Sequence, residues 1–190
     1  MKPNWFIALP IPAENWLPDL LSAAPRGCRL FHQADVHLTV AFLGGVSEEQ
    51  AIAAWREVGV GSRRAPLDVT LGASRPMGNP KQPSALALTV DRGHDALVEL
   101  LDGARGPAFG AAGIPAPKRP SLPHVTIARP TRRASAAQRD AFFGWGAGLQ
   151  PPTEALTLDR IALYTWSPDR KERLFFIKAQ RRWVGHPDEG

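Results

Sequence analysis

The sequence of 190 residues predicts an α+β protein, and three observations lead to this fold class. Short apolar or alternating runs typical of β-strands are interspersed with longer runs typical of helices. Many strand-like runs follow one another in the manner of antiparallel neighbours. One pattern (His, aliphatic residue, Thr, β-branched residue, Ala) occurs at 37–41 and again at 124–128, and this repeat indicates two related halves.

In the first half of the chain we expect two strand-then-helix steps. The first helix should begin with Pro12, because proline is favoured in the first turn of a helix. The second helix should be capped by Ser47, since Gln50 follows it at the spacing of a capping box. The expected elements are, in order, a strand at 4–10, a helix at 11–25, a strand at 36–44 and a helix at 47–58.

The second half begins with two strands that flank a segment rich in proline and glycine. Residues 73–83 contain three prolines and one glycine, so we expect an exposed loop that overhangs a site. A proline-rich connector at 114–123 leads directly into the second motif. The other expected elements are strands at 66–72 and 84–91, a helix from 93 to about 105, a helix near 134–145, and strands at 154–159, 160–166 and 173–183.

The composition indicates one folded unit. The chain is 44% hydrophobic and 22% charged, and no change of composition marks a linker. The single cysteine, Cys28, excludes an internal disulfide and a multi-thiolate metal site. The N-terminus has no apolar run of signal-peptide length and no later stretch has the roughly 18 apolar residues of a membrane span. We therefore expect a cytoplasmic protein with no membrane partner.

The charge balance is compatible with a polyanionic partner. Lysine and arginine together number 23 against 18 aspartate and glutamate residues, and most of the cations are arginines, which suit bidentate contact with phosphate. A genome rich in G and C, which encodes arginine in place of lysine, explains the same count equally well. Charge alone therefore does not identify a partner.

The two motifs each place an imidazole beside a hydroxyl. Because side chains alternate along a strand, His37 and Thr39 share one face, and so do His124 and Thr126. Phe42 has the opposite parity and is expected in the core. One histidine can accept a proton while the other donates one, and threonine hydroxyls can bind phosphate oxygens. The pair therefore predicts displacement at phosphorus in a cyclic phosphate or phosphodiester.

Two other interpretations of the motifs remain open. They could be half-buried strands whose polar groups are satisfied locally. The histidines could also bind zinc, with Asp35 as a lone third ligand on the same face as His37. The other histidines, at 32, 94 and 186, are not expected to be catalytic. Tyr164 or Trp166, at the end of a strand, could stack on a base.

These residues resemble the two-histidine phosphoesterase superfamily and, within it, the RNA 2′,3′-cyclic phosphodiesterases, formerly called 2′-5′ RNA ligases. The likeness covers nearly the whole chain, including "FIALPIP", "HLTVAFLG", "PHVTIAR" and "IALYTWSPDRKERLFFI". It implies a single bilobed domain over residues 1–190, with two antiparallel sheets, outer helices and a cleft where both motifs meet. It also implies that no metal or other cofactor is needed.

The resemblance implies roles for particular residues. His37 and His124 become the catalytic pair, with His124 as the base and His37 as the acid, although the reverse assignment stays open. Thr39 and Thr126 bind the substrate, and Arg129 matches an arginine that contacts phosphate. Arg129 lies five residues after His124, so it can reach the same face only if the strand ends or twists there.

The leading hypothesis is therefore hydrolysis of a 2′,3′-cyclic phosphate on RNA ends or nucleotides to the 2′-phosphate. The alternatives are 2′-5′ RNA ligation by reversal of the chemistry, a 2′-5′ phosphodiesterase, or an RNA-binding module without turnover. An ATP-dependent ligase is disfavoured because the chain lacks a G-x-x-x-x-G-K-[ST] loop. RNA ends or cyclic nucleotides are the expected partners, and we expect a monomer.

Overall fold

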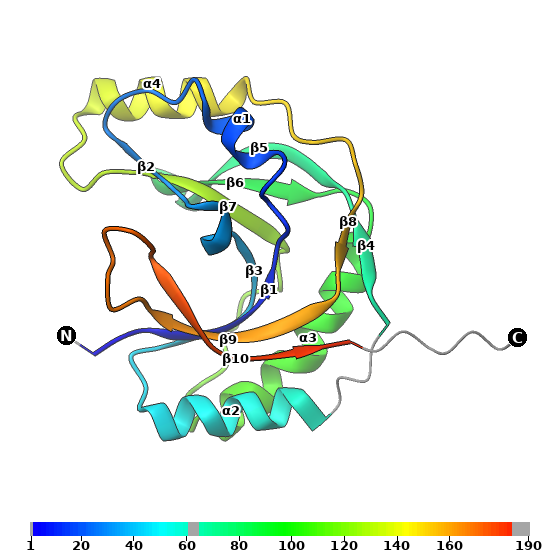
Figure 1. Ribbon diagram of the computed structural model, residues 1–190. Helices are drawn as coiled ribbons and strands as arrows, with labels where there is room; N and C mark the ends of the chain where they lie inside the picture. The colour runs from blue at the N-terminus through cyan, green and yellow to red at the C-terminus, as the bar shows by residue number, and fades with distance from the viewer. Residues whose placement is uncertain (1, 61–64, 184–190) are drawn as a thin grey trace, which may run out of the picture.

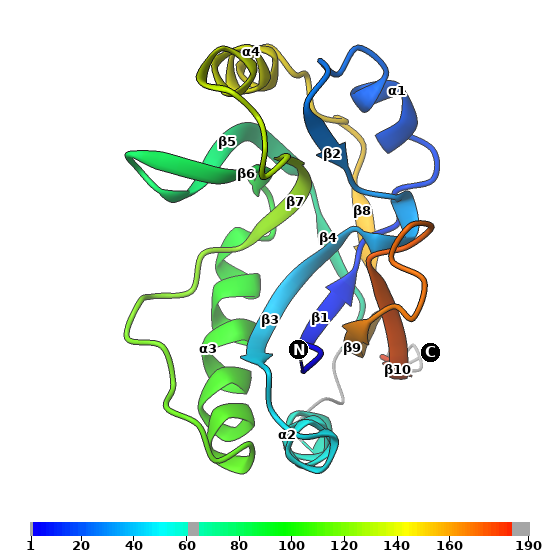
Figure 2. The ribbon, with the colours of Figure 1, turned by 90° about the vertical axis from the view of Figure 1, so that its left-hand side faces the viewer.

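The computed structural model describes residues 2–60 and 65–183 of the chain (Figures 1 and 2). Helices and strands are interspersed throughout, and the α+β class predicted from the sequence is confirmed. The strands are β1 (Trp5–Pro10), β2 (Cys28–Leu30), β3 (His37–Gly44), β4 (Leu67–Val69), β5 (Leu71–Asn79), β6 (Gln82–Val90), β7 (His124–Pro130), β8 (Leu156–Leu158), β9 (Arg160–Trp166) and β10 (Phe175–Arg182).

Four α-helices in the described part of the chain lie at two opposite ends of the molecule (Figure 1). The second and third pack against each other and against β1 and β3, whereas the fourth packs against β5 and β7. Outer helices, as expected, therefore cover both halves. The helices are α1 (Leu17–Leu21), α2 (Glu48–Val60), α3 (His94–Ala111) and α4 (Ala136–Ala147), with a short 3-10 helix at Gln33–Asp35.

The main sheet has the strand order β10-β9-β1-β3-β7-β6-β5, with β2 paired to β7, and all of its pairings are antiparallel. Its two central strands, β3 and β7, share a single registered pair, Leu38 with Val125. The two antiparallel sheets expected from the sequence are thus the two halves of this order, joined at a narrow seam (Figure 2). Strands β4 and β8 form a separate two-stranded sheet.

The capping signal read from the sequence is confirmed. Ser47 accepts a hydrogen bond from the Gln50 backbone N–H (3.3 Å) and donates its own N–H to the Gln50 side chain (3.0 Å), which starts α2. Ser135 and Gln138 form the same capping box at α4. Helix α1 is shorter than expected, since it begins at Leu17 and ends at Leu21, so the expected start at Pro12 is wrong. Helix α3 is longer and continues past Pro107 to Ala111.

The prediction of an exposed loop at 73–83 is wrong. Most of this segment forms the hairpin of β5 and β6, with its turn at residues 80 and 81. Proline is tolerated on β5 because β5 is the edge strand of the sheet, and Pro76 needs no partner on its outer side. Pro83 lies before the stretch of β6 that pairs with β7.

The packing of α4 on the sheet depends on Gly146. A Cβ atom at this position would lie 2.7 Å from both terminal methyl groups of Leu86, which is itself buried. Gly144, on the same helix, has no atom within 4 Å of its corresponding position. The two glycines therefore form a matched pair for a stability test.

We predict that Gly146→Ala lowers the free energy of unfolding by about 1–3 kcal/mol, because overpacking forces Leu86 or α4 to shift. Gly144→Ala should raise it by up to about 1 kcal/mol, since alanine is favoured in an open helical position. Chemical denaturation of both variants measures the difference. Equal effects of the two substitutions would mean that Leu86 does not limit the approach of α4.

Candidate active site

Strand β3 carries the first motif and contains a β-bulge. In its pairing with β1, Ile7 lies opposite Ala41 and Ala8 opposite Thr39, so Val40 is an extra residue. His37 and Thr39 are half-buried, whereas Val40 is buried. The bulge reverses the alternation of side chains beyond Thr39.

Strand β7 carries the second motif and has a bulge at the equivalent position. In its pairing with β6, Thr126 lies opposite Ala87 and Ala128 opposite Leu86, so Ile127 is the extra residue. Ile127 is fully buried. Each motif therefore bulges at the residue that directly follows its threonine.

The two bulges change which face the following residues occupy. Phe42 is five residues after His37, and Arg129 is five residues after His124. Both line the same cavity as the motifs. The expectation that Phe42 lies in the core is thus wrong, because its side chain is 56% exposed. The condition stated for Arg129 is met, since the bulge at Ile127 brings it to the motif face.

Both motifs open onto one cavity of about 400 Å³. This volume lies in the range of small-ligand sites. Within the described residues, the hydroxyl groups of Thr39 and Thr126 make no hydrogen bond to the protein, so both are available to a ligand. The structure thus brings together all five residues singled out from the sequence, which are His37, Thr39, His124, Thr126 and Arg129.

The two imidazoles are oriented by equivalent hydrogen bonds. Nδ1 of His37 lies 2.7 Å from the backbone carbonyl oxygen of Asp35, and Nδ1 of His124 lies 2.7 Å from that of Leu122. A carbonyl oxygen only accepts, so each Nδ1 carries the proton and donates it. In the neutral ring, Nε2 then remains an acceptor. This tautomer suits proton transfer with a ligand in the cavity.

His37 lies in an aromatic environment. Its ring centroid is 4.7 Å from that of Phe6, 5.2 Å from that of Phe175 and 5.5 Å from that of Tyr164. Burial among these rings disfavours the imidazolium and lowers the pKa of His37 from 6.5 to about 4. His37 is therefore neutral at pH 7 in the free protein.

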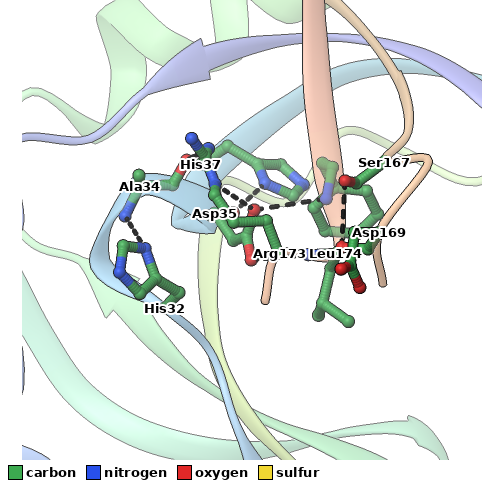
Figure 3. A network of polar contacts seen from close by, with 9 residues as sticks. His32, Ala34, Asp35, His37, Ser167, Asp169, Arg173 and Leu174 are labelled. Atoms are coloured by element: carbon green, nitrogen blue, oxygen red, sulfur yellow. Dashed lines mark hydrogen bonds and ion pairs between the residues drawn. The ribbon is translucent and has the colours of Figure 1, made fainter. Parts of the chain in front are cut away.

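Asp35 is a buried carboxylate that holds the start of β10 beside His37 (Figure 3). It accepts hydrogen bonds from the backbone N–H groups of Leu174 (2.8 Å) and Phe175 (3.2 Å) and forms an ion pair with Arg173 (3.5 Å). These contacts fix Phe175 against the His37 ring. The sequence did not indicate this role, because the partners lie about 139 residues away along the chain.

The zinc interpretation required Asp35 as a third ligand beside the histidines. Its carboxylate instead forms an ion pair with Arg173 and accepts hydrogen bonds from the backbone N–H groups of Leu174 and Phe175. Among the residues that the structure describes, no group of three or more His, Cys, Asp or Glu side chains could hold a metal ion. The charge of Asp35 is thus already neutralised within the protein.

The two aromatic residues proposed for base stacking have different positions. Tyr164 is 1% exposed and stacks on Phe6 with ring centroids 5.0 Å apart, and burial raises the pKa of its hydroxyl. It is a core residue, so the stacking role is wrong for it. Trp166 lines the cavity, and the guanidinium carbon of Arg170 lies 4.5 Å from the centroid of its ring.

Two of the remaining histidines, His32 and His94, lie outside the cavity lining. His32 caps the 3-10 helix by accepting the Ala34 backbone N–H at 3.1 Å. His94 begins α3 and pairs with Asp95. His186 lies outside the described residues.

Comparison with known proteins gives one curated relative and many similar structures. No protein-family model matches the chain. An RNA 2′,3′-cyclic phosphodiesterase of Bacillus subtilis (strain 168) is 28% identical over 134 residues, which cover 68% of this chain and 72% of the relative. The resemblance noted in the sequence is therefore confirmed by a curated relative.

The solved structures identify the fold. TT0787 of Thermus thermophilus is 20% identical with a TM-score of 0.72, over 96% of this chain and 99% of that one. E. coli LigT complexed with 3′-AMP is 20% identical with a TM-score of 0.67, over 97% and 99%. The protein has the fold of the LigT-like two-histidine phosphoesterases. None of the helices in the described ranges is long and apolar enough to cross a membrane.

The low pKa of His37 predicts a pH-dependent stability. In the unfolded chain His37 binds a proton near pH 6.5, whereas in the folded chain it does so only near pH 4. The contribution of this histidine to the free energy of unfolding is therefore fully present above pH 6.5 and is lost as the pH falls to 4. The loss should amount to about 3 kcal/mol. Chemical denaturation of the unaltered protein and of His37→Gln between pH 4 and 7 measures this loss. It is the difference between the two proteins in the slope of the free energy of unfolding against pH. Parallel profiles would contradict the shift.

Proposed function

We propose that the protein hydrolyses 2′,3′-cyclic phosphates, on RNA ends or nucleotides, to 2′-phosphates without a metal ion or other cofactor. The observation that carries the proposal is the convergence of His37, Thr39, His124 and Thr126 on one cavity, with Arg129 beside them. The name of the Bacillus subtilis relative and the 3′-AMP bound by E. coli LigT support this class of substrate.

In the proposed reaction, the oxygen of water forms a bond to phosphorus while the bond from phosphorus to the 3′ oxygen breaks. One histidine accepts a proton from water, and the other donates a proton to the departing 3′ oxygen. The threonine hydroxyls and Arg129 stabilise the charge that develops on the non-bridging oxygens. The product carries a 2′-phosphate and a free 3′-hydroxyl.

The resemblance to the family assigns the base to His124 and the acid to His37. His37 is neutral in the free protein at pH 7, so this assignment requires that the bound phosphate raises its pKa. A nearby negative charge has this effect on an imidazole. The exchanged assignment, with His37 as the base, needs no such shift and is the alternative.

The two histidines are the first test. We predict that His37→Ala and His124→Ala each lower turnover of 2′,3′-cyclic nucleotides by at least about 10²-fold, because each removes a positioned acid or base. The assay contains EDTA, and chromatography identifies the product. A variant with near-normal turnover would remove that histidine from the mechanism.

The hydrolysis assay, extended to other substrates and joined with a measurement of RNA binding, separates the competing functions. Hydrolysis that is lost with EDTA and restored by a metal ion would contradict the proposed mechanism. Cleavage confined to 2′-5′-linked dinucleotides would favour the 2′-5′ phosphodiesterase. RNA binding that survives the double substitution of both histidines, without turnover by the unaltered protein, would favour an RNA-binding module.

The threonines provide the second test. Thr39→Val and Thr126→Val keep the β-branched shape of a strand residue and remove the hydroxyl. Each should lower kcat/KM by about 10- to 10³-fold, as expected for the loss of a donor to the developing charge, with little change in Tm. Serine at either position restores the hydroxyl and should retain much of the activity. Equal losses with valine and serine would show that the threonines act by packing.

A further inference from the structure

Arginines dominate the charge of the cavity. Four of them line it, one from β2, one from β7, one after β7 and one from the loop between β9 and β10, and the lining contains no lysine, aspartate or glutamate. Apart from the two histidines, every ionisable side chain of the described lining is therefore cationic. The four are Arg29, Arg129, Arg132 and Arg170.

Three of these arginines, Arg29, Arg129 and Arg170, form a cluster in the lining of the cavity. Arg129 is near enough for its charge to act on His37. Arg29 lies opposite Arg129 in the pairing of β2 with β7. Burial and then the charge of Arg29 lower the pKa of Arg129. The same two causes lower the pKa of Arg170, and the negative charge of Asp35 opposes them in part. Arg29 is thus near both Arg129 and Arg170.

The positive charge of this cluster is not balanced by an ion pair within the described part of the protein. None of the four arginines lining the cavity forms an ion pair with a carboxylate there, and the neighbouring Asp35 is buried and already bound to Arg173. Like charges gathered in a partly desolvated site repel each other. A bound anion relieves this repulsion and gains charge-assisted hydrogen bonds.

The amount of charge exceeds what one cyclic phosphate requires. A 2′,3′-cyclic phosphate is a diester with a single negative charge, and Arg129 and the motif hydroxyls already surround its proposed position. Arg29 and Arg170 line the same cavity and add two further cationic groups to it. The stacking of Arg170 on Trp166 orients its guanidinium and leaves the N–H groups at its edge free to donate.

We propose that Arg29 and Arg170 form a second phosphate subsite, which binds the phosphodiester on the 5′ side of the reacting ribose. The preferred substrate is then the end of an RNA chain, and a free cyclic nucleotide without a 5′-phosphate is a poorer one. This inference rests on the proposed function. It adds a contact that a cyclic mononucleotide without a 5′-phosphate cannot make.

The test compares three substrates that share one reacting group. They are a cyclic mononucleoside 2′,3′-phosphate, a dinucleotide with the same cyclic end, and that dinucleotide with an uncharged methylphosphonate linkage. The charged dinucleotide should have a kcat/KM about 10- to 100-fold above that of the neutral one, as expected for charge-assisted hydrogen bonds to one phosphate. The neutral dinucleotide should resemble the mononucleotide.

Variants then locate the charge that is recognised. Arg29→Gln and Arg170→Gln should each reduce the ratio of kcat/KM for the charged dinucleotide to kcat/KM for the neutral one by at least about threefold. The double variant should bring this ratio close to one. Arg56→Gln, on the exposed side of α2, is the matched control and should leave the ratio as it is. Circular dichroism checks that each variant is folded.

Several outcomes would overturn the subsite. Equal hydrolysis of charged and neutral dinucleotides by the unaltered protein would do so, and so would a loss in Arg29→Gln that is the same for all three substrates. If no cyclic end is hydrolysed, the proposed function fails. The subsite is then tested by equilibrium binding of the two dinucleotides. The unaltered protein should still bind the charged dinucleotide more tightly than the neutral one, and the two affinities should become similar in the arginine variants.

Discussion

The narrow junction between β3 and β7 is the constraint on which the site depends. The two strands share one registered pair, Leu38 with Val125, and both residues are buried. The residues that flank this pair on the opposite face are those of the two motifs. The junction therefore holds one histidine and one threonine on each side of the cavity, and a shift of one half-sheet against the other would separate them.

The bulges extend this arrangement beyond the motifs. An extra residue after each threonine, Val40 in one half and Ile127 in the other, lets the strand bury two successive residues before it returns to the cavity. The residue that returns differs between the halves. Phe42 adds an aromatic side chain to the cavity, and Arg129 adds a cationic one. Two halves with the same backbone irregularity thus contribute chemically different side chains to the site.

The two histidines are equivalent in their hydrogen bonds and different in their surroundings. Both donate Nδ1–H to the carbonyl oxygen of the residue two positions earlier. Only His37 is packed among aromatic rings, because Asp35 ties the start of β10 and Phe175 to this half. Burial among these rings lowers the pKa of His37, since low polarity disfavours the charged imidazole.

The sequence by itself determined the α+β class, most of the strands and the capping box that starts α2. It also placed His37 with Thr39 on one face of a strand, and His124 with Thr126 on one face of another. These features depend on alternation, spacing and local hydrogen bonds, which short segments encode. Only the tertiary structure decided the edge hairpin at 73–83, because proline is tolerated there through the position of β5 in the sheet. It also decided where Phe42 and Arg129 point and what Asp35 binds. A bulge exists only in the register between two strands, and a buried carboxylate finds partners about 139 residues away only when the chain is folded.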